Sequence, residues 1–163
     1  MIVADTSALI TVASIDILGH VLTEFDVHIT ETVLEELEDT AEYEDVHGEA
    51  ARDVLNQQHR LTIHETSDTT VRSSRIDEGE GTTVELANGE RAEFLITDDL
   101  RALPELQTVT DANVVISPIV LQALVKRDVL DRAEALTKVE EAVENRDWLG
   151  RPIYRRAQDL FTD

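Results

Sequence analysis

The sequence has no cysteine, only two lysines and no long hydrophobic run. Without cysteine the chain forms no disulfide and no zinc-thiolate site. No apolar run approaches the roughly 20 residues that span a bilayer, and no basic region precedes the first apolar residues, so we expect neither a membrane segment nor a signal peptide. A nucleophilic triad, a glycine-rich phosphate loop and a metal-type histidine spacing are also missing from the sequence. These absences predict a cytoplasmic protein.

Acidic residues dominate the charge. Asp and Glu number 35 against 14 Lys and Arg, which gives a net charge of −21 at pH 7. Such a chain repels nucleic acid in dilute buffer, but molar salt shortens the Debye length to roughly 3 Å and removes most of that repulsion. The acidic, lysine-poor composition resembles that of haloarchaeal proteins, so we interpret the charge as adaptation to salt. An acidic module that binds a basic protein is the alternative interpretation.

Strand and helix patterns alternate along the chain, which predicts a three-layer α/β/α sandwich with a mostly parallel central sheet. We expect a single domain over residues 1–163, with 128–163 as a C-terminal helical extension packed on it. The expected strands are 1–4, 25–29, 61–64 near an edge, 92–97 and 113–116. The expected helices are 6–13, 15–22, 44–59, 82–87, 118–127 and 152–161, with two more opening at Thr30 and at Asp128 or Asp131.

Several local signals set element ends. Thr6 or Ser7 is expected to cap the first helix, and Ser117 to cap the helix that begins with Pro118. Asp98 and Asp99 are expected to cap a short helix ending near Pro104. The polar stretch 65–76 predicts a mobile loop at the rim of a site.

Asp5 stands where the first buried strand gives way to a helix. Ligands of open α/β sheets bind at the carboxyl ends of the strands, so a carboxylate at this position is placed for chemistry. Asp98 and Asp99 follow a second central strand in the same way. Glu36, beside the apolar stripe of its helix, and Glu80, before the helix 82–87, complete the set of candidate site residues.

These carboxylates suit a metal-dependent reaction. Crowded carboxylates raise one another's pKa unless a cation lies between them, and hard divalent cations select oxygen ligands. We therefore expect Asp5, Glu36, Glu80, Asp98 and Asp99 to bind Mg²⁺ or Mn²⁺ and to catalyse phosphodiester hydrolysis. Thr6 and Thr97 would hold water or an aspartate by hydrogen bonds.

Four segments resemble motifs of the PIN (PilT N-terminus) domain family. They are the opening Asp-Thr-Ser at 5–7, the Val-Leu-Glu-Glu-Leu helix at 33–37, the Gly-Glu segment at 79–87 and the Thr-Asp-Asp strand end at 97–99. The segments occur in the expected order over roughly residues 1–127, and the set is far more specific than any one segment.

The resemblance implies a metal-dependent endonuclease that acts on RNA, with Asp5, Glu36, Glu80 and Asp99 as its acidic residues and Asp98 as an additional candidate. Many small members of the family are VapC-type toxins that an antitoxin protein inhibits, and these are often homodimers. Other members process ribosomal RNA or have lost activity. The polar stretch before Asp77 and the extension after Arg127 depart from the toxin subset.

Other interpretations remain open. A catalytically inactive PIN-fold scaffold or protein-binding module would share the same fold, and a receiver-like or phosphatase-like domain would need a well-placed lysine that the chain lacks. In so acidic a sequence, a single Glu is more often solvated than catalytic. The tail contains Arg146, Arg151, Arg155 and Arg156, which would pair with acidic neighbours or form a local phosphate-binding patch.

Overall fold

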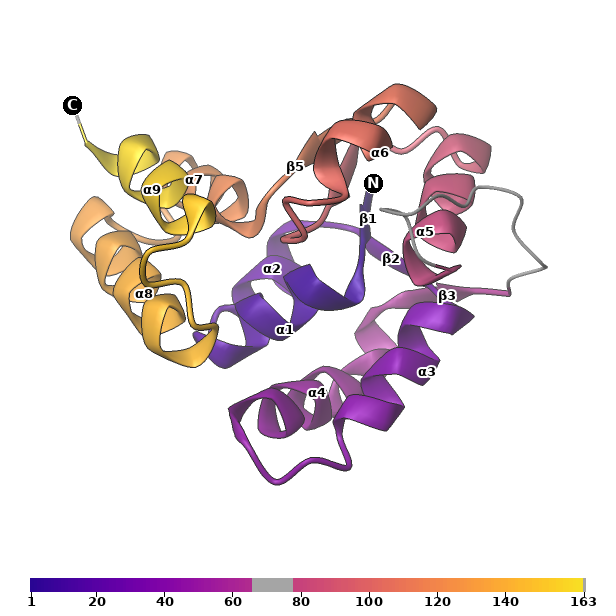
Figure 1. The fold of residues 1–163 in the computed structure, drawn as a ribbon, viewed down its shortest axis with the longest axis horizontal. Helices are drawn as coiled ribbons and strands as arrows, with labels where there is room; N and C mark the ends of the chain where they lie inside the picture. Colours follow the sequence, from indigo (N-terminus) through magenta and orange to yellow (C-terminus); the bar gives the residue numbers. More distant parts are fainter. Residues whose placement is uncertain (66–77, 163) are drawn as a thin grey trace.

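A computed structural model gives the fold of residues 1–65 and 78–162. Its centre is a five-stranded, all-parallel sheet in the order β3-β2-β1-β4-β5 (Figure 1). The strands are β1 (Ile2–Ala4), β2 (Val27–Thr30), β3 (Thr62–His64), β4 (Phe94–Ile96) and β5 (Asn113–Val115). The predicted central strands and the predicted edge position of residues 61–64 are confirmed.

Nine α-helices and one 3-10 turn surround the sheet within the described residues. They are α1 (Thr6–Ser14), α2 (Leu18–Glu24), α3 (Glu31–Thr40), α4 (Val46–Asn56), η1 (Gln58–Arg60), α5 (Glu78–Gly89), α6 (Leu103–Val109), α7 (Ser117–Lys126), α8 (Arg132–Asn145) and α9 (Pro152–Phe161). No single helix in this part of the chain is both long and apolar enough to cross a membrane. Only when α1 and α2 are counted together, despite the bend between them, are the length and composition sufficient.

The connections between parallel strands place the helices in two outer layers. Right-handed crossovers from β1 to β2 and from β2 to β3 put α1 to α4 on one face, and the return through β4 to β5 puts α5 and α6 on the other. In agreement, α1 packs on α4 and α7, whereas α5 packs on β1, β2 and β4. The predicted three-layer α/β/α sandwich is confirmed.

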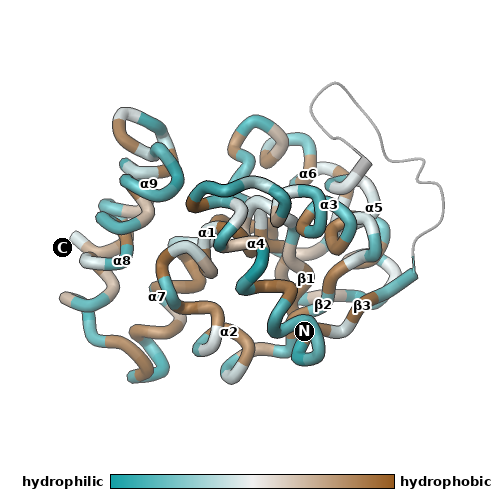
Figure 2. The backbone as a smooth tube through the Cα atoms, turned by 90° about the horizontal axis from the view of Figure 1, so that it is seen from below, coloured by the Kyte–Doolittle hydropathy of each residue, from teal (hydrophilic) through white to brown (hydrophobic). Residues whose placement is uncertain are grey.

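The core explains why β1 can form at the start of the chain. Val3 is fully buried and pairs with Leu95 of β4 on one side and His28 of β2 on the other. Strands buried on both faces have near-continuous hydrophobic sequences, as Ile2, Val3 and Ala4 do. Figure 2 shows hydrophobic stretches in the central strands and α7, whereas α8 and α9 alternate between hydrophilic and hydrophobic residues.

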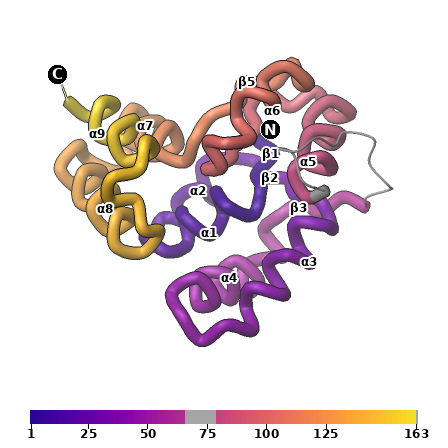
Figure 3. Tube along the Cα trace, viewed as in Figure 1, coloured from indigo at the N-terminus to yellow at the C-terminus, as the bar shows by residue number. Residues whose placement is uncertain are grey.

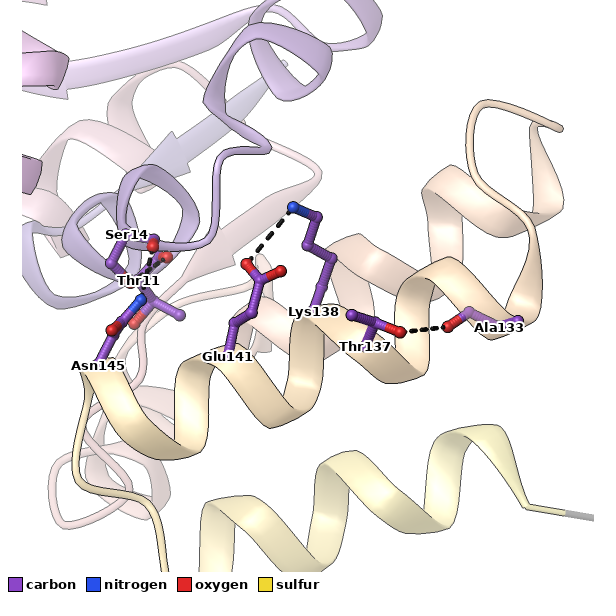
Figure 4. Close-up of polar contacts among 7 residues, drawn as sticks. All are labelled: Thr11, Ser14, Ala133, Thr137, Lys138, Glu141 and Asn145. Carbon is purple, nitrogen blue, oxygen red and sulfur yellow. Dashed lines mark hydrogen bonds and ion pairs between the residues drawn. The ribbon is translucent and has the colours of Figure 1, made fainter.

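Residues 128–162 lie at one end of the molecule, where α8 and α9 pack on each other and on α7 (Figure 3). The end of α8 also reaches α1. The Asn145 amide donates to the carbonyl of Ser14 at 2.7 Å (Figure 4), and the Asn145 carbonyl lies 3.2 Å from Nε2 of His47 in α4. The tail is therefore fixed to the same helices that flank the strand ends.

Three predictions about helix ends are wrong. Asp5, not Thr6 or Ser7, caps α1, because its carboxylate accepts from the N–H of Ala8. Pro104 opens α6 instead of ending a helix, since proline fits the first turn, where its missing N–H has no partner to lose. Ser117 does not cap α7, because its hydroxyl donates to Asp98. Of the predicted loop 65–76, all but Glu65 lies outside the described residues.

Candidate active site

A pocket of about 300 Å³ opens at the carboxyl edge of the sheet. Four of the five predicted site residues line it: Asp5, Glu36, Glu80 and Asp99. They come from the start of α1, the middle of α3, the first turn of α5 and the turn after β4. Because β1 and β4 are adjacent parallel strands, residues that are far apart in the sequence end at the same edge.

Asp5 is the most enclosed of the four, with 5% of its surface exposed. Its Oδ1 accepts from the Ser7 hydroxyl at 2.8 Å and from the Ala8 N–H at 3.0 Å, and its Oδ2 accepts from the Thr97 hydroxyl. Burial raises the pKa of Asp5 to about 6, even though these hydrogen bonds lower it. The pocket thus holds a carboxylate whose charged form is disfavoured by burial.

Thr97 joins the two central strands beside the pocket. Besides donating to Asp5, its hydroxyl accepts from the backbone N–H of Asp99 at 3.1 Å. The expectation that Thr97 would hold an aspartate is confirmed. Asp99 in turn accepts from the N–H of Arg101 through Oδ1 at 3.0 Å, which fixes the turn that follows β4.

Glu36 reaches the pocket from α3. Its Oε1 accepts from the Thr6 hydroxyl at 3.2 Å, so Thr6 holds a glutamate and not the expected aspartate. The carboxylate occupies space that a side chain at Gly79 would take, because a Cβ there would lie 2.9 Å from Glu36 Cδ and nearer still to Oε1. The glycine of the Gly-Glu segment thus allows α3 and α5 to approach each other.

Glu80 is 8% exposed and belongs to the first turn of α5. The hydroxyls of Thr82 and Thr83 both donate to the carbonyl of Gly79, at 2.8 and 2.9 Å. Thr82 also lies 3.0 Å from the Thr30 hydroxyl, next to the start of α3. These threonines fix the turn that carries Glu80.

Asp98 does not line the pocket of the other four. Its Oδ1 accepts from the Ser117 N–H and its Oδ2 from the Ser117 hydroxyl, each at 2.7 Å. Burial raises the pKa of Asp98, while the bonds from Ser117 and the charge of Arg146 lower it. Asp98 lines a second, neighbouring pocket of about 440 Å³. Its side chain joins the end of β4 to the start of α7.

Arg146 lines both pockets. The sequence only groups it with the other arginines of the tail. Its Nε donates to Thr11 Oγ1 at 3.0 Å and its Nη2 to the Ser7 carbonyl at 3.4 Å, so the guanidinium lies along α1. Burial lowers the pKa of Arg146, whereas Asp98 and Asp5 raise it. No short-range motif marks this residue, because its position depends on how α8 packs against α1.

The donor set suits a divalent cation in kind. Four carboxylates at one pocket offer the oxygen ligands that Mg²⁺ and Mn²⁺ prefer, and burial raises the pKa of one of them, Asp5. In residues 1–65 and 78–162, however, no three acidic or histidine side chains lie close enough together to hold one ion. A bound cation would have to draw the carboxylates inward.

A family model described as a PIN domain matches residues 1–161, which is nearly the whole chain. The comparison with curated proteins finds no match.

Proposed function

The chain belongs to the PIN domain family, whose members are generally nucleases, and we propose that it is a divalent-metal-dependent endoribonuclease. The observation that carries the proposal is the convergence of Asp5, Glu36, Glu80 and Asp99 on one pocket from four separate segments. Scattered surface carboxylates would not share a buried edge of the sheet, and Asp5 and Glu80 are each less than a tenth exposed.

In the proposed reaction, Asp5, Glu36, Glu80 and Asp99 would hold the cation. A bound Mg²⁺ or Mn²⁺ supplies charge neutralisation for the phosphate and lowers the pKa of water. Thr97 fixes the orientation of the Asp5 carboxylate, and Thr6 fixes that of Glu36. One of the two glutamates orients the attacking water and accepts its proton. The side chain of Asp98 takes no part in this scheme, because Ser117 engages both of its oxygens.

The same proposal covers the partners of the protein. RNA is the proposed substrate, and a VapC-type role would add an inhibitory antitoxin and a homodimeric assembly. The high acidic charge supports function in a salt-rich cytoplasm, where exposed carboxylates are screened and RNA is not repelled.

Cleavage of a labelled RNA in molar KCl tests the proposal. We expect cleavage with MgCl₂ or MnCl₂ and none with EDTA. Glu36→Gln should lower the rate by about 100-fold or more, as expected for loss of a group that acts in the transition state. Glu35→Gln is the matched control, since Glu35 is the exposed neighbour on the same helix. Cleavage that survives EDTA or Glu36→Gln would refute the proposal, and an inactive parent protein would favour the scaffold alternative.

A further inference from the structure

The second pocket adjoins the candidate active site. The two pockets share Asp99 and Arg146 as lining residues, so they adjoin each other near the end of β4. The second pocket is bounded by the turn after β4, the end of α8 and the start of α9.

Three arginines line this second pocket: Arg101, Arg146 and Arg151. The chain has only 14 basic residues against 35 acidic ones, so three guanidinium groups around one depression depart from its average surface. Arg101 is exposed, and 65% of the Arg151 side chain is exposed, so both groups are accessible to a ligand. Arginine donates in a planar fork that matches phosphate oxygens.

Asp98 and Asp5 offset the charge of Arg146, so the accessible positive charge of the second pocket comes chiefly from Arg101 and Arg151. The Asp98 carboxylate is held by Ser117, and Asp99 faces the first pocket as well. Asp147 lies 3.8 Å from Arg151, but its side chain is 89% exposed, and so open a pair contributes little. A phosphate entering the pocket can replace Asp147 as the partner of Arg151.

Arg146 is fixed between the two pockets. Asn145 attaches the end of α8 to Ser14 of α1, and Arg146 itself donates to Thr11 and Ser7. These bonds use Nε and Nη2 of a group that carries five N–H donors. The guanidinium is therefore held in place with donor capacity left for a ligand in either pocket.

We propose that the second pocket binds the backbone phosphates of the nucleic acid next to the cleaved bond, with Arg146 at the junction and Arg101 and Arg151 beyond it. This inference rests on the proposed function for its choice of ligand. Phosphate contacts of this kind position a strand without reading its sequence. The tail from α8 to α9 thus supplies part of the substrate site and does not merely cover the fold.

The test measures binding without cleavage. Fluorescence anisotropy with a labelled 12-nucleotide single-stranded RNA in EDTA, over the KCl range in which circular dichroism shows each protein folded, gives the affinity and its salt dependence. Arg101→Gln and Arg151→Gln should each weaken binding about threefold or more and reduce the salt slope by about 1. Arg146→Gln should do the same, and Arg146→Lys should restore part of the affinity.

Arg91→Gln is the matched control, because it removes the same charge from the turn before β4, at the opposite edge of the sheet. Binding by the parent that falls in the Arg101 and Arg151 variants, with Arg91→Gln unchanged, supports the proposal. No binding by the parent, or equal affinity in all variants, overturns it. A protein that binds in this way but never cleaves RNA with Mg²⁺ would refute the nuclease proposal alone.

Discussion

Thr97 donates its hydroxyl to Oδ2 of Asp5 and thereby links the ends of two neighbouring strands that are 92 residues apart in the sequence. The same hydroxyl accepts from the Asp99 N–H, so one side chain orients two residues of the pocket. Thr97 and Asp5 are both buried, which makes the loss of the hydrogen bond between them costly.

Thr97→Val should therefore lower both stability and activity. Asp5 loses a donor and the Asp99 N–H loses its acceptor, so we expect a loss of about 1–3 kcal/mol in the free energy of unfolding. Because the bond from Thr97 lowers the pKa of Asp5, the acid limb of the cleavage rate should move to higher pH. Urea unfolding and a pH–rate profile measure the two effects. Thr97→Ser keeps the hydroxyl and should resemble the parent, and identical behaviour of the two variants would disprove this role.

Asp5→Asn should stabilise the metal-free protein at neutral pH. The folded-state pKa of Asp5 is raised from 3.8 to about 6, so the folded state binds the proton more tightly than the unfolded state. The free energy of unfolding therefore falls as pH rises through this window, by about 3 kcal/mol from this group. Asparagine does not titrate. Comparing parent and variant by urea unfolding in EDTA at pH 4 and pH 7.5 isolates the effect, and a pH-independent difference would contradict it.

Gly79→Ala should impair catalysis more than folding. The new methyl group would displace the Glu36 carboxylate, and a shift of about 1 Å at a reacting group can cost about 100-fold in rate. Alanine favours the helix, which offsets part of the steric cost. Gly89→Ala is the control on the same helix, because a Cβ there meets nothing within 4 Å. Steady-state cleavage rates and melting temperatures of both variants give the comparison, and full activity of Gly79→Ala would contradict the expected contact.

Substitutions of the neighbouring Asp98 and Asp99 should affect different properties, stability in the first case and cleavage in the second. Asp98→Ala leaves the Ser117 N–H and hydroxyl without their acceptor and should lower the free energy of unfolding by about 1–3 kcal/mol. Asp99→Asn keeps Oδ1 as the acceptor for Arg101 N–H and should leave stability nearly unchanged while lowering cleavage. Unfolding and cleavage assays on both variants test this division. A stable Asp98→Ala protein without activity would contradict this division and indicate that Asp98 acts at the metal site.

Manganese should raise the melting temperature of the parent protein. A ligand that binds only the folded state stabilises it by an amount that rises with the logarithm of one plus the ratio of its concentration to its dissociation constant. Glu35→Gln should show the same increase as the parent, and Asp5→Asn should show little or none. Differential scanning fluorimetry with MnCl₂ and with EDTA measures the shift. Equal shifts in all three proteins would place the ion elsewhere.

The sequence predicts the sheet and most of the helices because its strands are short apolar runs and its helices carry clear apolar faces. It also predicts the four carboxylates of the pocket, since Asp5 and Asp99 lie just after buried strands and Glu36 and Glu80 belong to segments that resemble PIN motifs. Cap assignments fail where long-range bonds compete with local ones. Ser117 donates to Asp98, 19 residues earlier, and no local pattern indicates this.

The position of Arg146 in the site is also something that local sequence patterns do not predict. Its place beside Asp5 depends on the docking of α8 on α1, and this contact joins residues more than 130 positions apart. Periodicity locates a helix and its apolar face, but it does not say which neighbour the end of that helix touches. The sequence likewise does not indicate that Asp99 lines the first pocket whereas Asp98 does not, because both residues follow the same strand.

The parallel order of β1 and β4 has a consequence for the chain during synthesis. The first carboxylate of the pocket leaves the ribosome with residue 5, but its partner strand ends only at Ile96, and the guanidinium of Arg146 follows some fifty residues later. No nascent fragment that stops short of β4 can assemble the pocket. A growing polypeptide therefore lacks the set of four carboxylates until residue 99 has emerged, and lacks the arginine beside them until residue 146 has emerged.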